Sequence, residues 1–216
     1  MNSNDDLNRH DARGRAYQGL SALYHPPAAT LEKVLTLLKG GLEGCYPELA
    51  PYADDLLAEY REQADLGELR DDYTRLFLGP GPLAAAPYGS FYLDGGRTMG
   101  PTTLEAQQHY QVVGLKPGGE FKHPPDFIAT ELEFMFFLIH CQLQTADPGT
   151  ASQFMLRQRA FLNRHPGRWV EPFTELVIEE ARAEFYKVLG ALTQNFILAE
   201  QNALPELQAA SETNHG

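Results

Sequence analysis

The feature that most constrains this sequence is a proline-broken acidic stretch that runs directly into a long apolar segment, residues 120–141. At about 100° per residue, a helix that begins near Asp126 places Asp126 and Glu133 on one narrow polar stripe. Glu131 falls on the other side, among apolar residues such as Met135. An ionised carboxylate there is costly unless it is paired or hydrogen-bonded. We therefore expect Glu131 to meet either another segment of this chain or a ligand.

Apolar residues recur along the whole chain with helical spacing, and strand-like alternation is nearly absent. Thr30 is predicted to cap the second helix, and Gly40-Gly41 to end it. The sequence predicts an all-α protein, a bundle of about nine to ten helices. The expected helices lie near residues 16–24, 31–39, 47–64, 66–77, 102–113, 126–144, 147–165, 169–178 and 179–203.

The length of 216 residues is enough for a substantial core, in one large domain or in two small helical lobes. The natural boundary is the Pro- and Gly-rich segment at residues 115–125, which we call the hinge. We expect residues 1–216 to form a single all-helical domain, with the hinge between its N-terminal and C-terminal helical parts.

The chain is acidic, with 17 Lys and Arg against 29 Asp and Glu and a net charge of −12. Nucleic acid is excluded as a partner because the chain has no basic surplus to neutralise phosphates. Residues 54–72 carry eight acids and two bases. Such a run is either a solvated helix face or a docking surface for a basic peptide. The acids are Asp54, Asp55, Glu59, Glu62, Asp65, Glu68, Asp71 and Asp72.

Several features predict a cytoplasmic protein without stable membrane insertion. Cys45 and Cys141 are far apart and form no disulfide framework, which fits free thiols in a reducing compartment. The N-terminus is polar and lacks the apolar core of a secretion signal. The longest apolar stretch, residues 127–141, contains two glutamates and is too short to span a bilayer.

No catalytic or metal-binding pattern is present in the sequence. The Gly79–Pro82 loop lacks the Lys-Ser/Thr of a phosphate-binding loop, and residues 88–91 lack the second glycine of a nucleophile elbow. His123, His140 and His165 show no metal-ligand spacing. We therefore expect a binding protein rather than an enzyme, with no catalytic residue, metal or cofactor.

Four blocks of the sequence together resemble the TorD/DmsD family, and the likeness covers roughly residues 10 to 200. The blocks are Asp72-Tyr-Thr-Arg-Leu-Phe-Leu-Gly-Pro-Gly81, Ala86-Pro-Tyr-Gly-Ser-Phe-Tyr-Leu-Asp94, Pro125-Asp126 with Glu131-Leu-Glu-Phe-Met135, and Phe161-Leu-x-x-His165-x-x-x-Trp169-x-x-x-Phe173 followed by Glu184-Phe-Tyr-x-x-Leu189. They occur in the family's order within an acidic, helical chain.

The resemblance implies a cytoplasmic chaperone that matures molybdenum-containing redox enzymes before twin-arginine export. Its partner would be the precursor of a molybdopterin oxidoreductase, bound through the leader peptide and the body of the apoprotein. The chaperone would aid cofactor insertion and delay export, as a monomer or a homodimer. A basic leader followed by an apolar stretch requires an acidic rim and an apolar groove.

The resemblance also implies a set of peptide-binding residues. One departure is that the family usually has Asp-His in the hinge, whereas this chain has Asp126-Phe127, so the role of that histidine is not carried over. The implied peptide-binding residues are Tyr88, Gly89, Ser90, Phe91, Pro125, Asp126, Glu131, His165 and Trp169.

Simpler interpretations of the same residues stay open. Asp126 can cap its own helix, and Glu131 can be satisfied by a backbone N–H or by an arginine from the aromatic loop. Tyr88, Phe91 and Trp169 can belong to the core, and His165-Pro166 can mark a helix end. Two other functions remain: a nucleotide-binding, GTP-linked switch or enzyme that uses the Gly/Pro loop, and a plain helical adaptor.

Overall fold

The computed structural model describes the backbone of residues 3–62, 65–79, 83–115 and 123–212. These residues form ten α-helices and two short helical turns, which confirms the predicted all-α fold and the expected number of helices. In the described part of the chain the only strand-like pairing is an isolated bridge between Tyr88 and Phe127. The elements are α1 (Ser3–Leu23), α2 (Leu31–Cys45), η1 (Pro47–Leu49), α3 (Ala50–Glu62), α4 (Gly67–Tyr73), η2 (Thr74–Leu78), α5 (Gly89–Leu93), α6 (Pro101–Val112), α7 (Ile128–Gln144), α8 (Pro148–Arg164), α9 (Pro166–Glu180) and α10 (Glu184–Glu212).

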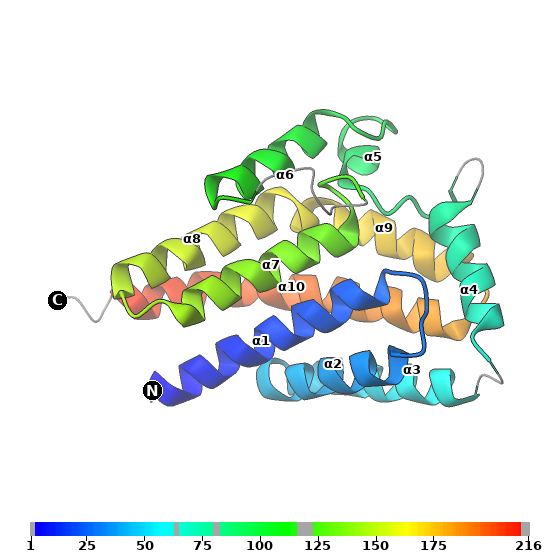
Figure 1. Cartoon of the computed structure of the whole chain (residues 1–216), viewed down its shortest axis with the longest axis horizontal. Coiled ribbons are helices and arrows are strands. Elements are labelled where there is room, and N and C mark those ends of the chain that lie inside the picture. The colour runs from blue at the N-terminus through cyan, green and yellow to red at the C-terminus, as the bar shows by residue number, and fades with distance from the viewer. Residues whose placement is uncertain (1–2, 63–64, 80–82, 116–122, 213–216) are drawn as a thin grey trace.

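The helices that precede and follow the hinge pack against one another (Figure 1). Helix α1 packs along both α2 and α7, while α10 packs against α9 and α3. One apolar core runs through these layers and includes Tyr17 of α1, Leu132 of α7, Trp169 of α9 and Phe196 of α10. In Figure 1 the short helices α5 and α6 lie on the outer side of α7 and α8. No described helix is both long and apolar enough to cross a lipid bilayer.

The prediction that Gly40-Gly41 ends the second helix is wrong, because α2 continues to Cys45. The glycines allow close packing instead. A Cβ atom on Gly41 would lie 2.6 Å from the backbone nitrogen of Ala16, and one on Gly19 would lie 2.8 Å from Cβ of Leu38. Helices α1 and α2 therefore approach through small residues. Thr30 occupies the N-cap position as predicted, but its side chain makes no hydrogen bond to the helix.

A buried ion pair links the first and last helices. The guanidinium of Arg13 donates to both carboxylate oxygens of Glu200, at 2.7 Å from Nε and 2.6 Å from Nη2, and both side chains are fully buried. The hydroxyl of Tyr46 donates to the same carboxylate at 2.6 Å. Burial alone would raise the pKa of Glu200, but the charge and hydrogen bonds of Arg13 hold it below its usual value.

The acidic run at residues 54–72 is not a uniform surface. Its last member, Asp72, is buried and accepts hydrogen bonds from the backbone N–H groups of Arg182 and Ala183, just before α10. Asp72 also pairs with Arg75 at 2.9 Å. Asp72 is therefore a structural cap for α10, while Glu68 and Asp71 of α4 remain exposed.

Candidate functional site

Two segments from opposite sides of the hinge are joined by backbone hydrogen bonds. The N–H of Gly89 donates to the carbonyl of Asp126, and the N–H of Ile128 donates to the carbonyl of Pro87, both at 2.9 Å. These bonds flank the bridge between Tyr88 and Phe127. The start of α5 and the start of α7 are therefore held together as one unit, which we call the clamp (residues 87–90 and 126–128).

Asp126 is fully buried and does not cap its own helix. The N-cap position of α7 is Phe127, and no side chain caps that end. Oδ2 of Asp126 instead accepts from the backbone N–H of Ser90 in α5, at 2.8 Å. The interpretation of Asp126 as the cap of its own helix is therefore wrong. The side chain fixes α5 across the clamp instead.

Glu131 is also fully buried, and its partners come from α9 and the turn before it. Nε1 of Trp169 donates to Oε2 of Glu131 at 3.0 Å, and Nδ1 of His165 lies 3.5 Å from Oε1. The expectation of a second segment of this chain is confirmed, whereas a backbone N–H or an arginine as the partner is wrong. Burial raises the pKa of the Glu131 carboxyl to about 7, although the neighbouring His165 and the hydrogen bond from Trp169 oppose the shift.

Gly89 lies against the face of the same tryptophan. A Cβ atom there would approach Nε1 of Trp169 to 2.8 Å, so this position has no room for a side chain. Tyr92, one turn along α5, stacks on the Trp169 ring with centroids 5.7 Å apart. Helix α5 is therefore held on one side by Trp169 and on the other by Asp126.

The structure brings the nine predicted site residues into one contiguous region, but most of them lie below the surface. Tyr88, Phe91 and Pro125 are partly exposed. Trp169 is a core residue, and His165 ends α8, as the simpler interpretations held. The six buried members of the set are Gly89, Ser90, Asp126, Glu131, His165 and Trp169.

Above the clamp lies an aromatic cluster that the sequence did not indicate, consisting of His25, Tyr88, His123 and Phe127. The rings of His123 and Phe127 stack with centroids 4.3 Å apart, and His25 and Tyr88 contact Phe127 at 5.9 and 5.8 Å. Burial and the neighbouring His123 lower the pKa of His25. Two histidines, His123 and His25, thus lie against Phe127. Residue spacing alone could not show that the loop after α1 reaches this point.

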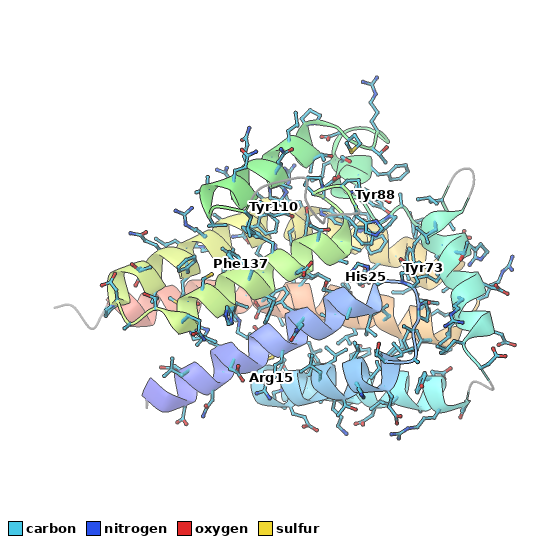
Figure 2. All side chains as sticks on the ribbon, viewed as in Figure 1. Arg15, His25, Tyr73, Tyr88, Tyr110 and Phe137 are labelled. Atoms are coloured by element: carbon cyan, nitrogen blue, oxygen red, sulfur yellow. The ribbon has the colours of Figure 1, made fainter. Side chains whose placement is uncertain are left out.

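Helix α4 borders the aromatic cluster. Tyr73 donates to the carbonyl of Tyr24, and Nε of Arg70 donates to the carbonyl of Pro27, each at 3.0 Å. Figure 2 shows His25, Tyr73 and Tyr88 gathered at the same end of the molecule. Glu68 and Asp71 of the same helix are exposed, and the helical period turns them away from the face that carries Tyr73.

A mostly apolar pocket of about 170 Å³ lies on the other side of Pro125, between α6 and α7. The hydroxyl of Tyr110 donates to the carbonyl of Pro125 at 2.6 Å and links the pocket to the clamp. Figure 2 shows Tyr110 and Phe137, two of the pocket residues, on these helices. Glu133 of the polar stripe also lines it and is exposed.

Two expectations fall outside the described residues. Most of the hinge (116–122) and most of the Gly/Pro loop (80–82) are not described. The hinge role and the nucleotide-binding alternative therefore stay predictions.

Comparisons with known proteins agree with the resemblance. Residues 38–175, more than half of the chain, match the model of the family described as nitrate reductase delta subunit, to which the TorD chaperones belong. The chain belongs to this family. The chaperone protein TorD of Aliivibrio fischeri is 30% identical over 157 residues, which cover 70% of this chain and 73% of that protein. TorD of Shewanella loihica is 28% identical over 214 residues, with 93% and 96% covered.

A solved structure supports the fold of this TorD-family chain. A candidate redox enzyme maturation protein from Archaeoglobus fulgidus superposes with a TM-score of 0.53 at 24% identity, over 85% of this chain and 93% of that protein. The names of the relatives describe chaperones, so the expectation of a chaperone rather than an enzyme is confirmed.

Proposed function

We propose that this TorD-family chaperone acts in the cytoplasm on the precursor of a molybdopterin oxidoreductase. It binds the twin-arginine leader and the body of the apoprotein, which aids cofactor insertion and delays export. The observation that carries the proposal is the aromatic cluster, where the partly exposed Tyr88 and the exposed His25 contact Phe127 at the end of the molecule that the acidic helix α4 borders.

The chemistry of this face fits a twin-arginine leader. The basic front of the leader meets the exposed carboxylates of Glu68 and Asp71, and the apolar stretch packs against Tyr88 and Phe91. The pocket between α6 and α7 takes a single apolar side chain near Pro125. The buried residues of the clamp do not touch the leader and instead hold Tyr88 in place.

Calorimetric titration of a client leader peptide at low and high salt tests the proposal. Charges beyond about 8–10 Å are screened at physiological ionic strength, so we expect wild-type affinity to fall as salt rises. The double variant Glu68→Gln/Asp71→Asn should bind more weakly at low salt and lose most of this salt dependence. Asp11→Asn on α1, far from the face, is the matched control and should behave as wild type. If the affinity of the wild type for the leader does not change with salt, the proposed contact between the acidic side chains of α4 and the basic front of the leader is contradicted.

A further inference from the structure

Three side chains with metal-binding atoms converge between α6 and the junction of α8 and α9. Glu105 and His109 are four residues apart and therefore lie on one face of α6. His165 lies in the turn that joins α8 to α9. One ligand atom from each of the three lies within 4.8 Å of the others. Residue spacing could not indicate this group, because His165 is more than fifty positions from the other two along the chain.

His165 supplies an independent observation. It is fully buried; Nδ1 faces Oε1 of Glu131 at 3.5 Å, and Nε2 has no hydrogen-bond partner among the described residues. Its ring stands edge-on to that of His109, with centroids 5.2 Å apart. Buried polar side chains are ordinarily hydrogen-bonded. A buried imidazole nitrogen that has no hydrogen-bond partner, and that lies near the ligand atoms of Glu105 and His109, therefore indicates a missing ligand.

We propose that Glu105, His109 and His165 bind a transition-metal ion of the zinc class, with the fourth coordination position open to water. Two imidazoles and one carboxylate form a ligand set that zinc takes in proteins. Glu131 lies behind His165, with Oε1 3.5 Å from Nδ1. A carboxylate in that place orients a metal-bound histidine and increases its basicity. The buried Glu131 thus acts as a positioning residue, itself held by Trp169.

The site closes by small side-chain movements. Ligand atoms around a tetrahedral zinc ion are about 3.4 Å apart, so spacings of up to 4.8 Å must shrink by up to about 1.4 Å. Glu105 and His109 are only partly buried and have room to rotate. The competing partner of Glu105 is Arg164, at 3.6 Å, and this pair is largely exposed and weak. A bound ion would displace Arg164 and tie α6 to the α8–α9 junction.

The test is calorimetric titration of Zn²⁺ into the full-length chain after it has been stripped with a chelator. Co²⁺ absorption reports the coordination geometry, and the fluorescence of Trp169, the single tryptophan, reports a change next to Glu131. We expect micromolar or tighter binding at one site and at least about tenfold weaker binding by His109→Ala. His140→Ala, which removes an exposed histidine of α7, is the matched control and should bind as wild type.

Glu131→Gln separates the positioning role from folding. Loss of such a carboxylate lowers metal affinity by about 10- to 100-fold, and the titration is performed where circular dichroism shows the variant folded. Absence of Zn²⁺ binding by the wild type would overturn the proposal. So would a His109→Ala variant with wild-type affinity, or a His140→Ala variant weakened as much as His109→Ala.

Discussion

Nε1 of Trp169 lies 3.0 Å from Oε2 of Glu131, so the one carboxylate on the apolar side of α7 meets the single tryptophan of the chain. This hydrogen bond links the first helix after the hinge to α9. Gly89 of the clamp lies against the same indole ring. The arrangement explains why a charged residue is retained in the core, and the first two predictions follow from it.

The stability of the protein should depend on pH through Glu131. Burial raises the pKa of its carboxyl from 4.5 to about 7, so between these values the unfolded chain releases a proton that the folded chain keeps. This residue therefore lowers the free energy of unfolding as pH rises through that window. The glutamine of Glu131→Gln does not titrate, so the variant lacks this pH dependence. Its free energy of unfolding, relative to that of the wild type, should therefore rise by up to about 3 kcal/mol between about pH 5 and pH 8. Urea denaturation of both proteins at the two pH values measures this, and an unchanged difference would refute it.

Gly89→Ala should destabilise the protein by about 1–3 kcal/mol, because the added methyl group overpacks the site beside Trp169. Gly40→Ala in α2 is the matched control, since nothing lies within 4 Å of the position that its methyl group would take. A helix-interior alanine there should stabilise by about 0.5–1 kcal/mol. Thermal denaturation of both variants checks the pair. A Gly89→Ala variant as stable as wild type would show that α5 can move away from the tryptophan.

The two neighbouring acids of α4 should behave differently. Asp72→Ala removes the cap of α10 and the partner of Arg75, and should lower the free energy of unfolding by about 1–3 kcal/mol. Asp71→Ala changes an exposed side chain and should stay within about 0.5 kcal/mol of wild type. Chemical denaturation distinguishes them. If both variants lose the same free energy of unfolding, the hydrogen bonds of Asp72 to α10 contribute little to stability.

The helical fold could be predicted from the sequence because the apolar spacing of each helix is a local property. The burial of Glu131 could be predicted for the same reason, since its place on the apolar side of α7 depends only on the helical period. Its partners could not be predicted, because the pairing with Trp169 and His165 depends on how α9 packs against α7.

The candidate site shows the same limit. The residues of the clamp were identified through motifs, but their burial was not. The sequence predicted Asp126 to lie on a polar stripe, whereas it precedes α7 and is buried against α5 in the folded chain. Likewise, Asp72 was grouped with the other acids of residues 54–72, and its hydrogen bonds to the N–H groups before α10 depend on how α4 packs in the folded chain. The aromatic cluster was missed because its members come from three separate segments.

Co-purification of a client precursor with this chain tests the central claim most directly. A tagged molybdopterin oxidoreductase precursor from the same genome is co-expressed with the wild type, with Tyr88→Ala, and with Leu7→Ala, which changes an exposed apolar side chain on α1. We expect the wild type and Leu7→Ala to be retained by the precursor, and Tyr88→Ala to be retained several-fold less while remaining folded. Deletion of the leader should reduce retention without abolishing it, because the body is also bound. Failure of the wild type to co-purify, or equal retention of Tyr88→Ala, would contradict the account.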